Sequence, residues 1–283
     1  MSVKQIPLAD GTRRFFGRKR SLVEHPRLKM NNYMLSALPT PPSQYGYARE
    51  AQTELHQMYL NDQLGDCVEA CIAHAVGVFG AQNGAQWIFT PAQITALYSA
   101  WGGYVPGNPS TDNGTDIQTA LAGWQKYGAP GPDVSAFFKP VIGAPIYKAH
   151  QIIGSLKLDA ANMQEVRTAI WLFENAILGL ELPDAWINPF PSASGFVWDV
   201  AGAPDPNNGY CVLVTNYNPS GLLIATWALN GVMTDAAFQE YCGTANGGEV
   251  YAVLSEDIID RAQQKAPNGI AWSSLVADLK SLS

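Results

Sequence analysis

The chain has 283 residues and a net charge of −7 at neutral pH, with 47 % apolar and only 14 % charged residues. These proportions exclude a globally disordered chain and allow one large domain with a sizeable core. No apolar run reaches the roughly 18 residues that a membrane-spanning helix needs. The first twenty residues also lack the apolar stretch of a secretory signal peptide, so we expect neither a membrane span nor secretion by such a signal.

Residues 1–45 are expected to form an extended basic arm with little regular structure, and residues 46–283 to form one domain. The first thirty residues contain eight basic and two acidic side chains, whereas the rest contains nine basic and twenty-two acidic ones. Such an arm can bind nucleic acid, an acidic neighbour or its own body. We expect it to lie on its own body or on a neighbouring subunit. The candidate binding residues are Arg13, Arg14, Arg18, Lys19 and Arg20.

Helical signals dominate the first two thirds of the domain. Asp66 is a suitable N-cap for an apolar, buried helix, and Thr90 followed by Pro91 is a typical helix start. Asn162 and Glu165 have the spacing of a capping box. The predicted helices cover residues 66–79, 90–101, 116–127 and 162–174.

Strand signals dominate the last third. Two apolar, β-branched runs flank a Pro-Ser-Gly turn, which is typical of a hairpin. Short strands are expected within 139–158 as well. A helical front half followed by a sheet-rich back half predicts an α+β fold with a cleft between the halves. The predicted strands cover residues 176–182, 210–218, 222–229 and 249–255, with a short helix at 234–242.

The stretch NDQLGDCVEAC, residues 61–71, places Cys67 in the first turn of a predicted helix. A thiol nucleophile is often found there, because the helix dipole favours the thiolate. Cys71, Cys211 and Cys242 have no zinc-ligand spacing, and we expect them to be buried, free thiols. No cofactor motif is present, and we expect neither a cofactor nor a metal ion.

Four segments in the same order resemble those of papain-like cysteine peptidases. The resemblance is greatest to phage and bacterial proteins of that fold, which carry GDC, GGHAV, TWG and YAVLS-type motifs. It covers roughly residues 50 to 260 and implies a papain-like fold. The matching segments are NDQLGDCVEACIAH (61–74), GYCVLVTNY (209–217), IATWALNGVMT (224–234) and FQEYCGTANGGEVYAVLSEDII (238–259).

The resemblance also implies roles for individual residues. Cys67 falls on the nucleophile position, and Asn61 falls on the oxyanion-stabilising amide, with Gln63 as a second candidate. Tyr210 falls on the position of the histidine base. A tyrosine is mostly protonated at neutral pH and is a poor acceptor for a thiol proton. The position that orients the base falls near Thr226 and Trp227.

Another histidine would have to act as the base if the thiol were active. His74 lies two helical turns beyond Cys67, too far to reach it, and is expected to be a core residue. His56 is the most plausible substitute, and Asn230 the nearest amide that could orient a base. His25 lies in the arm and His150 in a linker-like stretch.

We therefore predict a degenerate, catalytically inactive papain-like protein that acts by binding. The expected role is a structural component of a phage virion, such as a capsid decoration protein, with the major capsid protein or another virion subunit as partner. Before assembly it would reside in the host cytoplasm. Nucleic acid is expected to bind only through the arm, and no membrane is expected to be involved. The alternative is an active cysteine peptidase or amidase that uses Cys67 with an unrecognised base.

Overall fold

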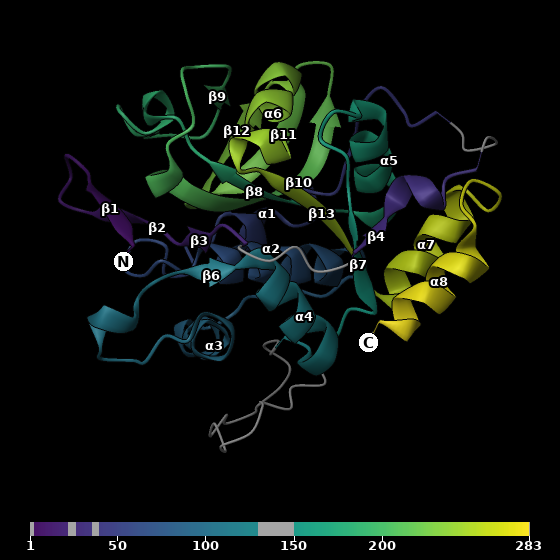
Figure 1. Ribbon diagram of the computed structural model, residues 1–283, viewed down its shortest axis with the longest axis horizontal. Coiled ribbons are helices and arrows are strands. Elements are labelled where there is room, and N and C mark those ends of the chain that lie inside the picture. The colour runs from purple at the N-terminus through teal and green to yellow at the C-terminus, as the bar shows by residue number, and fades with distance from the viewer. Residues whose placement is uncertain (1–2, 22–26, 36–39, 130–149, 283) are drawn as a thin grey trace.

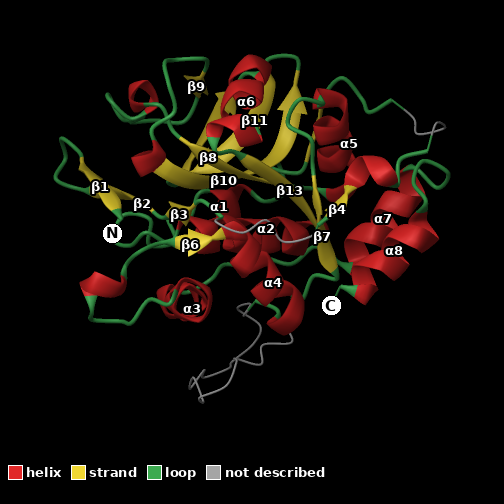
Figure 2. Ribbon diagram, in the orientation of Figure 1, coloured by secondary structure: helices red, strands yellow, loops and turns green. Residues whose placement is uncertain are grey.

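The computed structural model describes residues 3–21, 27–35, 40–129 and 150–282. Within these ranges a nine-stranded, mostly antiparallel sheet packs on the central helix α2 (Cys67–Gln82) (Figure 1). Figure 2 shows α3 and α4 below the sheet with α2, whereas α6 lies on the far side of the sheet. The α+β class predicted from the sequence is confirmed.

The sheet is centred on two strands that are buried along their whole length. β8 (Ala176–Glu181) and β13 (Glu249–Leu254) are nearly continuous apolar runs, as expected for strands covered on both faces. Along the sheet the order is β4 (Leu28–Lys29), β7 (Gly154–Lys157), β13, β8, β10 (Gly209–Asn218), β11 (Gly221–Thr226), β12 (Leu229–Met233) and β9 (Phe196–Trp198), and β5 (Tyr45–Gly46) also pairs with β10.

The helices begin where their capping residues predict. Thr90 forms a full capping box with Gln93, Asp116 caps α4, and Asn162 accepts a hydrogen bond from the amide of Glu165. Short strands were expected within residues 139–158. The described part of this range contains one strand, β7, and residues 130–149 lie outside the described ranges. The other helices are α1 (Gln52–Leu55), α3 (Pro91–Leu97), α4 (Ile117–Tyr127), α5 (Met163–Phe173), α6 (Asp235–Tyr241), α7 (Glu256–Lys265) and α8 (Trp272–Ser281).

The arm contains more regular structure than the sequence indicates. β1 (Lys4–Pro7) and β2 (Arg13–Phe16) form a hairpin, and β3 (Arg18–Lys19) pairs in parallel with β6 (Thr115–Asp116). The strand β3 forms because its backbone groups find partners on the body, which the local sequence cannot reveal. Figure 1 shows the arm entering beside α2 and below the sheet. None of the helices in the described ranges is both long and apolar enough to cross a membrane.

Candidate functional site

Cys67 is the first residue of α2, and its side chain is only 1 % exposed. Burial raises the pKa of the thiol well above its ordinary value, and the neighbouring Cys211 adds to this rise. The backbones of Gly17 and Cys211 near the sulfur oppose the rise, but their effect is smaller. The helix start therefore holds a protonated thiol and not a thiolate.

The arm passes directly over this thiol at Gly17. The Gly17 carbonyl accepts a 2.7 Å hydrogen bond from the amide of Thr115, and the amide of Phe15 donates to the carbonyl of Asn61 at 3.0 Å. A Cβ atom on Gly17 would lie 1.6 Å from the Gly65 carbonyl oxygen. Only glycine fits this close approach, so the arm is tightly packed where it covers Cys67.

Asn61 is held by hydrogen bonds at both ends of its side-chain amide. Its Nδ2 donates to Oδ1 of Asp66 at 2.8 Å, and its Oδ1 accepts from the hydroxyl of Tyr210 at 2.6 Å. The Tyr210 oxygen in turn accepts from Oγ1 of Thr226 at 3.0 Å. All four side chains are buried. One of the two N–H donors of the amide that would stabilise an oxyanion is therefore used within the protein. Gln63 is exposed and donates to Asp62.

Asp66 occupies the N-cap position of α2, as predicted, but its side chain does not cap the helix. It accepts from Asn61 instead, and its second oxygen is buried without a hydrogen-bond partner. Glu69 and Asp112 lie close enough to act on Asp66 electrostatically. Burial raises the pKa of Asp66 well above its ordinary value, and burial also raises that of Glu69 to about 8. Asp66 and Glu69 are therefore favoured in their protonated forms.

Aromatic rings complete the surroundings of Tyr210. Phe16 of the arm packs edge-on against both Tyr210 and Trp227, with ring centroids 5.7 and 6.0 Å away. Trp227 lies 4.3 Å from Tyr210, centroid to centroid. Burial raises the pKa of Tyr210 well above 10, with a further contribution from Cys67. Tyr210 thus lies beside the thiol as a neutral phenol.

Arg18 anchors the arm one residue beyond Gly17. Its Nε and Nη2 donate to Oε1 of Glu249 at 2.9 and 2.5 Å, and both side chains are buried. Arg18 was predicted to bind a partner. In the observed conformation two of its guanidinium nitrogens are held by Glu249 inside the protein, and binding of a partner through Arg18 stays a prediction.

The other predicted arm residues face outward to different degrees. Arg13 is exposed and donates to Gln5, whereas half-buried Arg14 donates to Thr12 and to the carbonyl of Arg13. Lys19 and Arg20 are exposed. These four side chains therefore remain accessible to a partner.

The structure describes three of the four histidines, His56, His74 and His150. His74 is buried, hydrogen-bonds the carbonyl of Glu54 through Nδ1, and has its pKa lowered to about 4 by burial, which confirms its core role. His56 is exposed and contacts the Gln52 carbonyl and, through Nε2, the amide of Asn230 at 3.2 Å. The groups that act on the Cys67 thiol include no described imidazole. His25 lies outside the described residues.

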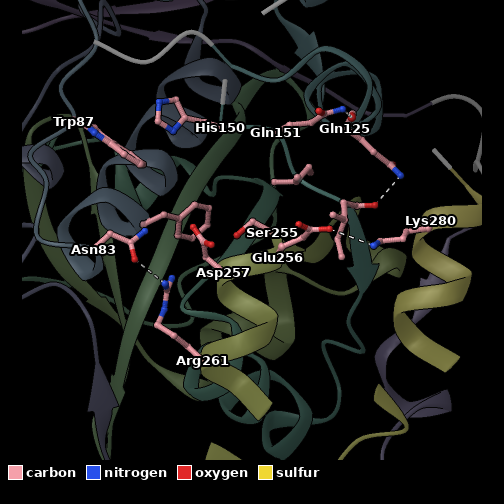
Figure 3. Close-up of a pocket in the computed structure, with 13 residues that line it drawn as sticks. Asn83, Trp87, Gln125, His150, Gln151, Ser255, Glu256, Asp257, Arg261 and Lys280 are labelled. Atoms are coloured by element: carbon pink, nitrogen blue, oxygen red, sulfur yellow. Dashed lines mark hydrogen bonds and ion pairs between the residues drawn. The ribbon is translucent and has the colours of Figure 1, made fainter. Parts of the chain in front are cut away.

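A cavity of about 550 Å³ lies elsewhere, at the start of α7 (Figure 3). Trp87 and His150 lie on one side of it, with ring centroids 4.0 Å apart. Asn83 is joined to Arg261, and Glu256 to Lys280. None of the site residues predicted from the sequence lines this cavity. Among the described side chains, no group of three or more His, Cys, Asp and Glu is arranged to hold a metal ion.

Comparison with solved structures identifies the architecture. Xylellain, a cysteine protease from Xylella fastidiosa, superposes with a TM-score of 0.62 and 12 % identity over 85 % of this chain and 96 % of that one. Procathepsin L 3 from the larval midgut of Tenebrio molitor gives a TM-score of 0.53 and 16 % identity over 81 % and 76 % of the two chains. The chain has the papain-like fold. No protein-family model and no curated protein sequence matches it.

The sequence predicted Cys67, Asn61 and Tyr210 as site residues. In the papain-like fold Tyr210 lies next to both Asn61 and Cys67. Sequence reasoning missed Gly17 and Glu249, which hold the arm over the thiol. One signal was available, namely a glycine between Phe16 and Arg18 in an otherwise bulky, basic run. Nothing in the sequence pairs Arg18 with Glu249, which lies 231 residues later.

Proposed function

We propose that this chain is a catalytically inactive papain-like protein that works by binding, as a structural component of a phage particle. The observation that carries the inactivity is the environment of Cys67. The thiol is buried beneath Gly17 of the chain's own arm, and the group beside it is the phenol of Tyr210. Tyr210 would thus stand where an active enzyme has its histidine.

Two requirements of thiol catalysis are unmet by this arrangement. The nucleophile needs a lowered pKa, whereas burial raises the pKa of Cys67. The base needs a proton affinity near the working pH, whereas Tyr210 keeps its proton and donates it to Asn61. The oxyanion needs a donor aimed at it, and only one of the two N–H groups of the Asn61 amide is used, by Asp66.

Thiol labelling and hydrolysis assays on the whole chain and on a variant lacking residues 1–20 test the inactivity. We expect no peptide hydrolysis from either protein and slow alkylation of Cys67 in the whole chain, at a rate that rises only at alkaline pH. Circular dichroism checks that the truncated variant is folded. Hydrolysis that appears on truncation, is lost in Cys67→Ala and survives in Cys242→Ala would overturn the proposal. If the truncated chain is unfolded, the same assays on Gly17→Ala decide.

The virion role has support from the sequence segments that resemble phage-type proteins and from the charge of the arm. The hairpin of β1 and β2 and the residues that follow present Arg13, Lys19 and Arg20 to solvent. These cations suit an acidic surface on a neighbouring shell subunit, such as the major capsid protein. Mass spectrometry of purified particles would detect the chain in a fixed ratio to the shell protein. Its loss on washing in moderate salt would contradict a structural role.

The second candidate is a latent cysteine peptidase or amidase. The specific observation in its favour is that the arm covers a thiol at a helix start. Two similar solved structures are titled a procathepsin and a stem bromelain precursor, the latter with a TM-score of 0.53 and 12 % identity over 81 % of this chain and 77 % of that one. This candidate requires a base, for which His56, already in contact with Asn230, is the first to test. Activity that depends on His56 in the truncated chain would favour it.

A further inference from the structure

Arg18 has one guanidinium nitrogen without a partner inside the protein. Its Nε and Nη2 both donate to a single oxygen of Glu249, and the other oxygen of that carboxylate accepts from the hydroxyl of Tyr251 at 2.8 Å. Nη1 is buried and makes no hydrogen bond. A buried donor on a cation is costly to leave unpaired. This geometry indicates a missing acceptor next to Nη1.

A cavity of about 160 Å³ lies at this point, between the arm and the body. Three of its lining side chains are cationic and one, Glu249, is anionic, so the lining carries excess positive charge. The arm contributes residues on one side, and the ends of β7 and β13 with the loop before β13 contribute the other. The lining residues are Arg18, Arg20, Ser21, Gln118, Lys157, Thr244, Gly247, Gly248, Glu249 and Tyr251.

Several polar groups around the cavity are already used within the protein. Ser21 donates its hydroxyl to Asp116, and the amides of Gly247 and Gly248 donate to carbonyls of their own loop. The donors that remain for a ligand are the buried Nη1 of Arg18, the guanidinium of the exposed Arg20 and the hydroxyl of Thr244. Two of these three donors belong to cations, which suits an anion.

We propose that this cavity binds a small tetrahedral oxyanion of the phosphate or sulfate class, which bridges Arg18 and Arg20 of the arm to the loop before β13. The cavity is smaller than the roughly 300–1,000 Å³ of pockets that hold drug-sized ligands, so a free anion fits and a nucleotide does not. Arginine is well suited to such anions because its planar fork of N–H groups matches their oxygens.

Because Arg18 lines the cavity, an anion bound there would also affect the accessibility of the Cys67 thiol. Arg18 follows directly after Gly17, which covers Cys67. An anion held by Arg18 and the body therefore fixes the arm at the residue next to the covering glycine. This inference concerns the seating of the arm and does not depend on whether Cys67 is a working nucleophile.

The test is a titration of the whole chain with sodium phosphate, sodium sulfate or sodium acetate, against sodium chloride at matched ionic strength. The readouts are the midpoint of thermal unfolding and the rate of Cys67 alkylation. We expect phosphate and sulfate to raise the midpoint in a saturable way and to slow alkylation at least threefold, and acetate to act like chloride. Arg20→Gln should weaken phosphate affinity at least fivefold, whereas Arg13→Gln, which alters an exposed arginine of the same arm, should leave it within twofold.

Three results would overturn the proposal. Phosphate that acts no differently from chloride would mean that the cavity takes no specific anion. Equal weakening by Arg20→Gln and Arg13→Gln would mean diffuse attraction to the basic arm. Acetate that binds as tightly as phosphate would exclude the tetrahedral class. Because Arg20 and Arg13 are both exposed, neither variant is expected to unfold the chain.

Discussion

The hydroxyl of Tyr210 donates a 2.6 Å hydrogen bond to Oδ1 of Asn61, 149 residues earlier in the chain. This bond joins strand β10 of the sheet to the segment that precedes α2, across the line where the two halves of the fold meet. It also fixes the orientation of the Asn61 amide, whose Nδ2 then faces Asp66. One contact between the two halves thus fixes the orientation of the Asn61 amide.

Tyr210→Phe should destabilise the protein by about 1–3 kcal/mol, because it leaves the buried oxygens of Asn61 and Thr226 without their partner. Urea unfolding measures the loss. Tyr104→Phe is the matched control: Tyr104 is half-buried, and its hydroxyl makes no hydrogen bond to the described residues. A variant as stable as the wild type would mean that the hydrogen bond contributes nothing net.

Gly17→Ala should displace the arm, because the added methyl group would lie against the Gly65 carbonyl. We expect Cys67 to be alkylated at least tenfold faster than in the wild type, while the far-ultraviolet circular dichroism stays unchanged. Ala9→Ser adds one atom at the exposed tip of the same arm and should leave the rate unchanged. If Gly17→Ala were labelled at the wild-type rate, the arm would not be what protects the thiol.

Arg18→Met should cost about 3–5 kcal/mol of stability, because it leaves Glu249 charged and buried without its partner. The double variant Arg18→Met, Glu249→Met should regain much of this loss, since both buried charges are then removed. Chemical unfolding of the four members of this double-mutant cycle gives the coupling. The exposed pair Lys280 and Glu256 provides a control, for which removal of one partner should cost under about 1 kcal/mol.

The raised pKa of Glu69 predicts a loss of stability with rising pH. Its pKa lies at about 8 in the folded protein and at 4.5 ordinarily, so between these values the folded state binds the extra proton. Stability should therefore fall as pH rises from about 4.5 to 8, by up to about 1.4 kcal/mol per pH unit from this group. Glu69→Gln should remove this part of the slope. Glu50→Gln, at an exposed position, should retain the wild-type profile.

The lowered pKa of His74 predicts the opposite dependence at acid pH. The folded pKa is about 4 against 6.5 ordinarily, because burial disfavours the imidazolium. Stability from this group is fully present above pH 6.5 and is lost as pH falls toward 4. A nuclear magnetic resonance titration, with His74→Gln to assign the signal, should show the imidazole neutral down to about pH 4. A midpoint near 6.5 would contradict the buried placement.

The sequence predicted those elements that are governed by local signals. The helix starts at Thr90 and Asn162 follow from capping chemistry, and strands β8, β10, β11 and β13 follow from apolar runs. Cys67 at the start of a helix was predicted for the same reason. The predicted cap of this helix is replaced by a tertiary contact, because the Asp66 side chain accepts a hydrogen bond from Asn61 and does not cap its own helix.

The course of the arm could not be predicted, because its partners lie far away in the sequence. Local propensity gave an arm of little structure, whereas pairing with the body creates β3 and β6 from two residues each. Arg18 had the appearance of a surface cation, and only the fold brings Glu249 to it. The charge pattern that suggested a binding arm is thus partly satisfied within the protein itself.

The distance along the chain between Arg18 and Glu249 also constrains the order of folding. Glu249 is synthesised 231 residues after Arg18, on strand β13. Contacts of such long separation form late and slow the search for the native state. The arm can pair with residues 61 and 115 earlier, but the Arg18 guanidinium stays accessible to any other acidic group until β13 has been made.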